Sequence, residues 1–264
     1  MRVRSTAAGR AAMAGAIVAA GALFLSGCTP APAPVPPSPS AALHYVAFGD
    51  SWPYGAHCGG CEPFPELYAD GLEEVQSAPV EFTNLVTNGG TSHDLREEIE
   101  SSESTRAAVA EADVIIISTG ANDLEPGMAK WLEGSCGGAD QLDCFREIAD
   151  GWQANFDAIL TEVDGLRGGR PTAVRIITNS NEFLSDPGLI DIFGADFGVN
   201  GGATITALHH DALCAAAAKH DAMCIDLRPV LNGPDQTTPA DVNTQDSMQA
   251  VADALLASGL GELD

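Results

Sequence analysis

The chain has 264 residues, of which 37 are acidic and 12 are basic, so its formal net charge at pH 7 is −25. Hydrophobic residues make up 45% of it, enough for a sizeable core, which excludes a wholly disordered protein. So negative a surface repels phosphate groups, and this excludes nucleic acid and anionic lipid as partners of the protein surface.

Residues 1–27 have the features of an export signal. Three arginines lie within the first ten residues, and an apolar run over 11–24 follows that is too short to span a bilayer comfortably. The segment ends in LSGC, which resembles the lipobox of bacterial lipoproteins, where the cysteine, here Cys28, is lipidated and becomes the first residue. The alternative is an ordinary secretory signal that is cleaved nearby.

Residues 28–42 are rich in proline and alanine and show no apolar periodicity. Such a segment is extended and semi-rigid, and it holds a domain away from a surface. We therefore expect a folded domain over 43–264 that is exported and lipid-anchored to the outer face of the membrane, or else secreted.

Apolar runs and helical periodicity alternate along this domain. Five runs are predicted strands: Leu43–Phe48, Val80–Thr87, Asp113–Ser118, Ala173–Thr178 and Met223–Leu227. Helical patterns separate or follow them, over about 63–75, 91–112, 152–163, 199–220 and 248–256. This alternation indicates an α/β protein, a three-layer α/β/α sandwich with a mainly parallel sheet, without a second domain.

Six cysteines remain after Cys28: Cys58, Cys61, Cys136, Cys144, Cys214 and Cys224. An even number in an exported chain favours disulfides, and we expect the three pairs that are adjacent in sequence. The HCGGC stretch at 57–61 is alternatively half of a zinc site or a redox pair. A zinc site needs further ligands, and the sequence has no second CxxC and no HxxxH.

Polar side chains follow the first three strands. Gly49-Asp50-Ser51 comes after the first, Gly89-Gly90 after the second and Asn122 after the third. The carboxyl ends of parallel strands meet at one edge of a sheet, where α/β proteins build their sites. Taken singly, each stretch is also explained by a turn or a helix cap.

Together, in this order, these stretches resemble the SGNH/GDSL hydrolases, over roughly Leu43 to Leu256. The resemblance implies a flavodoxin-like three-layer fold and a serine esterase that needs no cofactor or metal. It makes Ser51 the nucleophile, and it makes the backbone N–H of Gly89 and the side-chain amide of Asn122 donors to the oxyanion, beside the N–H of Ser51.

This sequence departs from the family pattern at the fourth block. In the family, a histidine, with an aspartate about three residues earlier, precedes the last helix and acts as general base. Alignment of that helix places Val242 at the histidine position and Pro239 at the aspartate position, and no histidine follows His220.

A serine attacks at neutral pH only when a base takes its proton. The candidates are His57, in the loop after Ser51, His93, just beyond the second block, and Asp241, beside the vacant position. A carboxylate of ordinary pKa, about 3.9, is a poor match for this task. The other histidines are expected to be structural or on ordinary helix surface: His44, His209, His210 and His220.

The sequence therefore predicts an esterase or acyl-transfer hydrolase acting on a small-molecule, lipid or glycan ester at the cell envelope. The main alternative is a catalytically weak or inactive protein of the same fold that binds an acyl or glycan ligand. A third interpretation is an envelope scaffold that uses the fold only as a rigid body.

Overall fold

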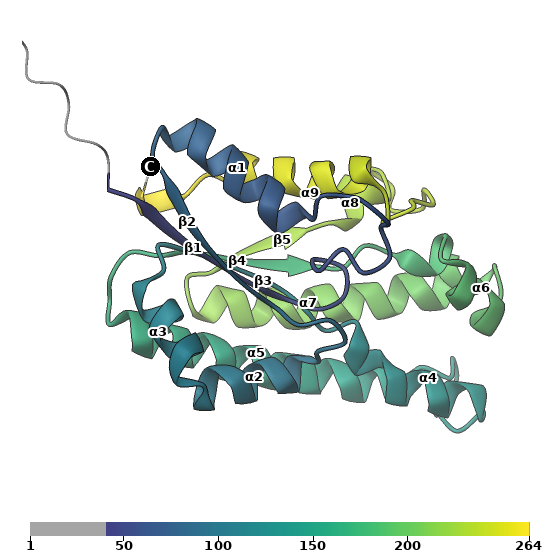
Figure 1. The fold of residues 1–264 in the computed structure, drawn as a ribbon. Coiled ribbons are helices and arrows are strands. Elements are labelled where there is room, and N and C mark those ends of the chain that lie inside the picture. The colour runs from purple at the N-terminus through teal and green to yellow at the C-terminus, as the bar shows by residue number, and fades with distance from the viewer. Residues whose placement is uncertain (1–40, 264) are drawn as a thin grey trace, which may run out of the picture. The chain divides into compact units, whose positions relative to one another are not determined.

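The computed structural model describes residues 41–263 (Figure 1). The predicted signal, the site of lipidation at Cys28 and nearly all of the tether lie outside these residues. Five parallel strands form one sheet in the order β2-β1-β3-β4-β5. Their bounds are Leu43–Gly49 for β1, Val80–Val86 for β2, Val114–Ser118 for β3, Ala173–Thr178 for β4 and Met223–Asp226 for β5.

Helices cover both faces of this sheet (Figure 1). One face is covered by α1 (Phe64–Gln76) and α9 (Gln245–Ala257). The opposite face is covered by α2 (Ser92–Ser101), α3 (Glu103–Glu111), α5 (Asp143–Arg167) and α7 (Ala203–Lys219). Three shorter helices complete the fold: α4 (Glu125–Leu132), α6 (Pro187–Phe193) and α8 (Arg228–Leu231). The predicted three-layer α/β/α sandwich with a parallel sheet is confirmed.

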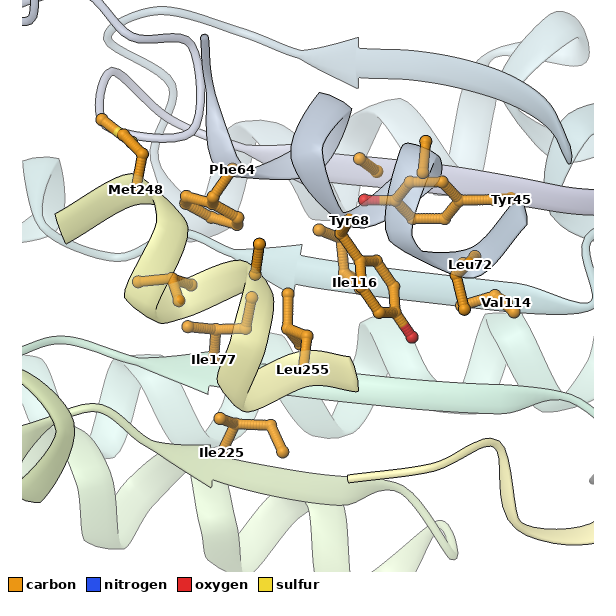
Figure 2. Close-up of a cluster of buried hydrophobic side chains, with 14 of the residues drawn as sticks. Tyr45, Phe64, Tyr68, Leu72, Val114, Ile116, Ile177, Ile225, Met248 and Leu255 are labelled. Atoms are coloured by element: carbon orange, nitrogen blue, oxygen red, sulfur yellow. The ribbon is translucent and has the colours of Figure 1, made fainter. Parts of the chain in front are cut away.

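Strand residues alternate between two apolar cores. Tyr45 and Ala47 of β1 face α1 and α9, whereas Val46 and Phe48 face the opposite helices. This alternation follows from the two-residue period of a strand. Figure 2 shows the first core, in which Phe64, Tyr68 and Leu72 of α1 pack with Met248 and Leu255 of α9 against the sheet. Each such fully buried side chain contributes about 1.5–3 kcal/mol to folding.

The strand order determines where a site can form. β2 lies on one side of β1, and every later strand lies on the other side. The connections therefore leave the carboxyl ends of β1 and β3 in opposite directions, which opens a crevice between them. Ser51 follows β1 and Asn122 follows β3, so two of the predicted site residues lie at this switch point.

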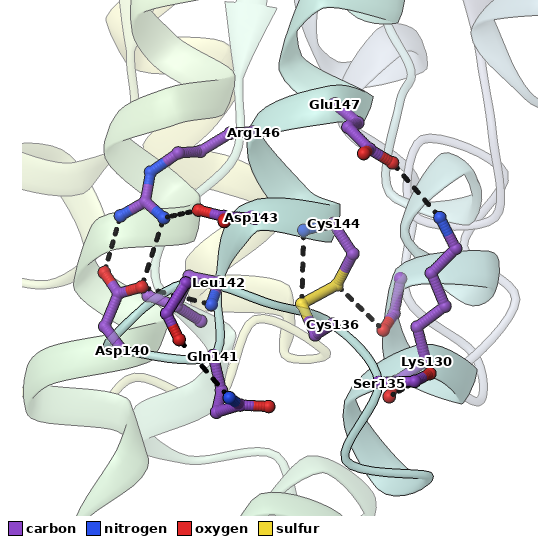
Figure 3. The surroundings of a disulfide bond; sticks show 12 residues. Lys130, Ser135, Cys136, Asp140, Gln141, Leu142, Asp143, Cys144, Arg146 and Glu147 are labelled. Atoms are coloured by element: carbon purple, nitrogen blue, oxygen red, sulfur yellow. Dashed lines mark hydrogen bonds and ion pairs between the residues drawn. A yellow bond between two sulfur atoms is a disulfide. The ribbon is translucent and has the colours of Figure 1, made fainter.

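Three disulfides join the cysteines in the sequence-local pairs that we expected, Cys58–Cys61, Cys136–Cys144 and Cys214–Cys224. Figure 3 shows the second of them, which closes the loop before α5. Arg146 of α5 fastens the same loop, because its guanidinium lies 2.5 Å from Asp140 Oδ2 and 2.7 Å from Asp143 Oδ1. Between residues 41 and 263, the chain contains no helix that is long and apolar enough to cross a bilayer.

Candidate active site

The turn after β1 presents Ser51. The N–H of Asp50 donates to the carbonyl of Ser118 at 3.1 Å, and the N–H of Ala56 donates to the carbonyl of Ser51 at 3.0 Å. A glycine is required at position 49, because a Cβ there would lie 2.3 Å from Pro53 Cγ and 2.8 Å from the carbonyl oxygen of Ser118. The turn therefore packs tightly against β3 and leaves Ser51 partly exposed at the sheet edge.

The turns after β2 and β3 are joined to each other. Gly89 has φ +81°, a left-handed conformation that glycine adopts without steric cost. The side-chain amide of Asn122 donates to the carbonyl of Gly90 at 2.9 Å. This bond uses one of the two amide hydrogens of Asn122, and the second remains available.

A buried network supports the turn after β3. Ser92 Oγ donates to Asp123 Oδ1 at 2.5 Å, and the N–H of Ser92 donates to Asp123 Oδ2 at 2.9 Å. Asn155 of α5 donates to Ser92 Oγ at 2.9 Å. Because Asn122 precedes Asp123, these bonds restrict the backbone that carries the predicted oxyanion donor.

A cavity of about 270 Å³ opens beside Ser51. Its lining includes these residues with chemically active side chains: Asp50, Ser51, His57, Asn122, Ser180, Glu182, Asp186 and His209. Gly89 is not among the lining residues, but the bond between Asn122 and Gly90 places its turn next to them. The structure thus brings Ser51 and Asn122 to one cavity, with the Gly89 turn adjacent.

Val242, which the sequence alignment put at the histidine position, also lines this cavity. It is buried, and its carbonyl accepts a hydrogen bond from Trp52 Nε1 at 2.9 Å. The loop is therefore fixed against the residue that follows Ser51. The neighbouring Asp241 is exposed and does not line the cavity, and its Oδ1 accepts the N–H of Asn243 at 3.0 Å.

The two histidines predicted to approach Ser51 differ in their positions. His57 is exposed and lines the cavity. His93 is on α2, where its Nε2 lies 3.4 Å from Glu97 Oε1, and it does not line the cavity. Of the two, only His57 shares the space that contains Ser51.

The expectation that His209 lies on ordinary helix surface was wrong. His209 of α7 is buried and lines the cavity. The N–H of Asn179 donates to its Nδ1 at 3.3 Å, and its Nε2 lies 3.4 Å from the carbonyl of Thr119, which can only accept. These partners select the neutral Nε2–H tautomer, and burial lowers the pKa to about 4. With both ring nitrogens engaged, His209 connects the ends of β3 and β4 and is not positioned to act as a base.

Two carboxyl groups beside the cavity have raised pKa values. Burial raises the pKa of Asp50 to about 6, although hydrogen bonds from the backbone of Trp52, Ala121 and Gly120 oppose this effect. Burial, together with the nearby carboxylates of Asp50 and Asp186, raises the pKa of Glu182 to about 7. Desolvation and like charges both disfavour the ionised form of an acid.

Sequence reasoning missed the contribution of the fourth strand. Asn179 and Ser180 follow β4 directly, Glu182 lies in the next turn, and all three line the cavity. The rule that was applied to the first three strands, that polar residues after a parallel strand meet at one edge, would also have found these residues.

The structure therefore combines a parallel α/β sandwich with a serine and an asparagine that line one cavity at its switch point. The model of the GDSL-like lipase/acylhydrolase family matches residues 47–247, so the chain belongs to this family of ester hydrolases. A search of curated proteins gives no match.

Solved structures of several lipases share the fold. A lipase from a goat rumen metagenome superposes with a TM-score of 0.65 at 23% identity, covering 84% of this chain and 100% of that one. A phospholipase A1 from Streptomyces albidoflavus gives a TM-score of 0.59 at 14% identity, covering 82% and 99%. An extracellular lipase from Streptomyces rimosus gives 0.55 at 15% identity, covering 82% and 99%. At these identities the likeness establishes the fold alone.

Proposed function

We propose that the protein is a serine esterase that acts on carboxylic esters at the cell envelope, to which a lipid on Cys28 anchors it. The observation that carries the proposal is that Ser51 and Asn122 line one cavity at the switch point of the sheet. A nucleophile and an oxyanion donor must both reach the same carbonyl group, and a shared cavity meets this requirement.

In this mechanism Ser51 Oγ attacks the ester carbonyl carbon, and the carbonyl oxygen becomes an oxyanion. The N–H groups of Ser51 and Gly89 and the free amide hydrogen of Asn122 stabilise this charge. Collapse of the intermediate expels the alcohol and leaves an acyl group on Ser51. Water then releases the acid and regenerates the serine.

The proton of Ser51 has no imidazole at position 242 to accept it. His57 is the histidine of choice for this role, because it is exposed and lines the same cavity. If neither His57 nor any other group takes this proton, we expect hydrolysis of activated aryl esters, whose leaving groups need no acid, and slow turnover of unactivated alkyl esters. Brisk hydrolysis of alkyl esters that survives His57→Ala would contradict this assignment of the base.

The proposal is tested by incubating the purified protein with a fluorophosphonate and locating the adduct by mass spectrometry. We expect a single adduct on Ser51, and no adduct in Ser51→Ala. An adduct on a different serine, or aryl ester hydrolysis that persists in Ser51→Ala, would refute the serine mechanism.

The second candidate function is a binding protein for an acyl or glycan ligand, and Val242 favours it because an apolar side chain occupies the position of the usual base. Such a protein keeps the cavity but does not react. The same experiment separates the two candidates, since a binding protein leaves Ser51 unlabelled at reagent concentrations that label an active esterase.

A further inference from the structure

One end of the cavity is strongly acidic. Asp50, Glu182 and Asp186 all line it, and among the described residues that line it there is no lysine or arginine. None of these three carboxylates forms an ion pair with a basic side chain of the described chain. Carboxylates that are withdrawn from water are normally paired with a cation.

The hydroxyl of Ser180 is a second, independent feature at the same end of the cavity. Ser180 is 3% exposed and lines the cavity, and its hydroxyl oxygen has no hydrogen-bond partner among the described residues. A buried hydroxyl is ordinarily hydrogen-bonded, so an unpaired hydroxyl in the wall of a cavity indicates a position where a ligand binds. Its oxygen carries lone pairs that a positive charge attracts.

Two aromatic side chains also line the cavity. Phe183, which follows Glu182, and Trp152 of α5 both line the cavity. The face of an aromatic ring attracts cations, and aromatic walls combined with carboxylates are suited to quaternary ammonium groups. His209 adds no positive charge, because its hydrogen bonds hold it neutral.

The energetics favour the same ligand. Burial raises the pKa of both Glu182 and Asp50, and the carboxylates of Asp50 and Asp186 also raise the pKa of Glu182. A cation placed between them relieves the repulsion and replaces the lost hydration, whereas an anionic ligand increases the cost.

We propose that this acidic end of the cavity binds a cationic group, a quaternary ammonium of the choline type, that is carried by the substrate. The placement of that group on an ester rests on the proposed function; the binding of the cation itself does not. A negatively charged acyl or phosphate group is excluded from this end.

The test compares choline with 3,3-dimethyl-1-butanol, in which a carbon atom replaces the charged nitrogen at nearly constant shape. Titration calorimetry of the purified full chain at pH 8, above the pKa of Glu182, measures both affinities. We expect choline to bind at least about ten-fold more tightly than the alcohol.

Two variants test whether the preference for choline depends on the carboxylate of Glu182. In Glu182→Gln the preference for choline falls to within about two-fold, because one of the three carboxylates that line this end is lost. Glu133→Gln removes the same charge from an exposed position that does not line the cavity, and it preserves the preference. Equal binding of choline and the alcohol by the unmodified chain overturns the proposal. An equal loss in both variants also overturns it, since bulk charge would then explain the binding.

Catalysis provides a separate readout. Acetylthiocholine and its neutral analogue 3,3-dimethylbutyl thioacetate differ only in the charged nitrogen, which is a carbon atom in the analogue. We expect Glu182→Gln to lower the kcat/KM for acetylthiocholine relative to that for the analogue. An equal fall for both thioesters shows that Glu182 acts on the reaction and not on the cation, which overturns the proposal.

If Ser51→Ala abolishes turnover and fluorophosphonate labelling but choline still binds, the cation site is independent of Ser51. If Ser51 is labelled but choline does not bind, the esterase proposal stands and this one fails.

Discussion

Asn122 uses one amide hydrogen to hold the second and third turns together and keeps the other for a ligand. A donor already fixed before the reaction loses no energy in orienting itself when charge develops on the carbonyl oxygen. The geometry of the two turns thus determines how the Asn122 amide is oriented in the proposed oxyanion hole.

Asn122→Ala is expected to lower kcat for an activated aryl ester by about 10²–10³-fold, the usual effect of removing one oxyanion donor. Steady-state kinetics measure the change, and circular dichroism checks that the variant is folded. Asn84→Ala is the matched control, because this exposed asparagine bonds only to Glu66 and the backbone of Val86. An unchanged rate in Asn122→Ala means that the oxyanion lies elsewhere.

Glu182 is expected to make the protein less stable as the pH rises. Its pKa is about 7 in the folded protein and 4.5 ordinarily, so the folded state binds the proton more tightly. The stabilisation by this proton is present below about pH 4.5 and is lost as the pH rises through about 7.

Glu182→Gln removes this dependence. From pH 4.5 to pH 8, the free energy of unfolding of the variant relative to the unmodified chain should rise by roughly 3 kcal/mol, which corresponds to the shift of about 2.5 pKa units between 4.5 and about 7. Urea unfolding at both pH values measures it. The same difference at the two pH values would mean that Glu182 titrates normally.

At the scale of the elements, the loop that carries Val242 is fixed by a main-chain bond and by the packing of the buried Val242 side chain in the core. The carbonyl of Val242 accepts the bond from Trp52, so a change of side chain leaves this contact in place. A substitution at this position keeps the main-chain bond and changes the packing of the side chain.

Val242→His places an imidazole on this fixed backbone, and we expect kcat/KM for an alkyl ester to rise about ten-fold. A positioned general base contributes ~10²–10⁴-fold, and the gain stays below that range because Pro239 leaves the imidazole without its aspartate. Val242→Ala controls for the change in cavity size. If both variants gain activity equally, access to the cavity is limiting and not the base.

The disulfide between Cys136 and Cys144 shapes the loop before α5 without reaching the cavity. Replacing both cysteines with serine should lower the free energy of unfolding by about 2–3 kcal/mol, as expected for a closed loop of this length. Urea unfolding measures this loss. Aryl esterase activity in native buffer should remain, and its disappearance would mean that the loop positions catalytic groups.

The elements themselves were predictable because their signals are local. Runs such as Val114–Ser118 are continuous and apolar, as buried parallel strands are, and they appear in the structure within a residue of their predicted ends. The regions around α6 and α8 were missed, because short helices in long connections have little periodicity.

The site was predictable where it follows strand ends and not where it depends on packing. Ser51 and Asn122 follow their strands directly, so the rule for parallel sheets finds them. His209 lies in the middle of α7, and only the crossing of that helix over the ends of β3 and β4 brings it to the cavity. No spacing in the sequence records such a crossing.

For the molecule as a whole, the proposed lipid on Cys28 can be tested directly in cells. Cells grown with radiolabelled palmitate should label the protein, and Cys28→Ser should abolish the label. Persistence of the label in that variant would refute lipidation at this cysteine.

The order of the disulfides along the chain has a consequence for biogenesis. The six paired cysteines are joined first to second, third to fourth and fifth to sixth, at separations of 3, 8 and 10 residues. An oxidant that couples cysteines in the order of their emergence from a ribosome or a translocation channel produces the native set directly. We therefore expect the disulfides to form without reshuffling of wrongly paired bridges, a step that takes seconds to hours in other proteins.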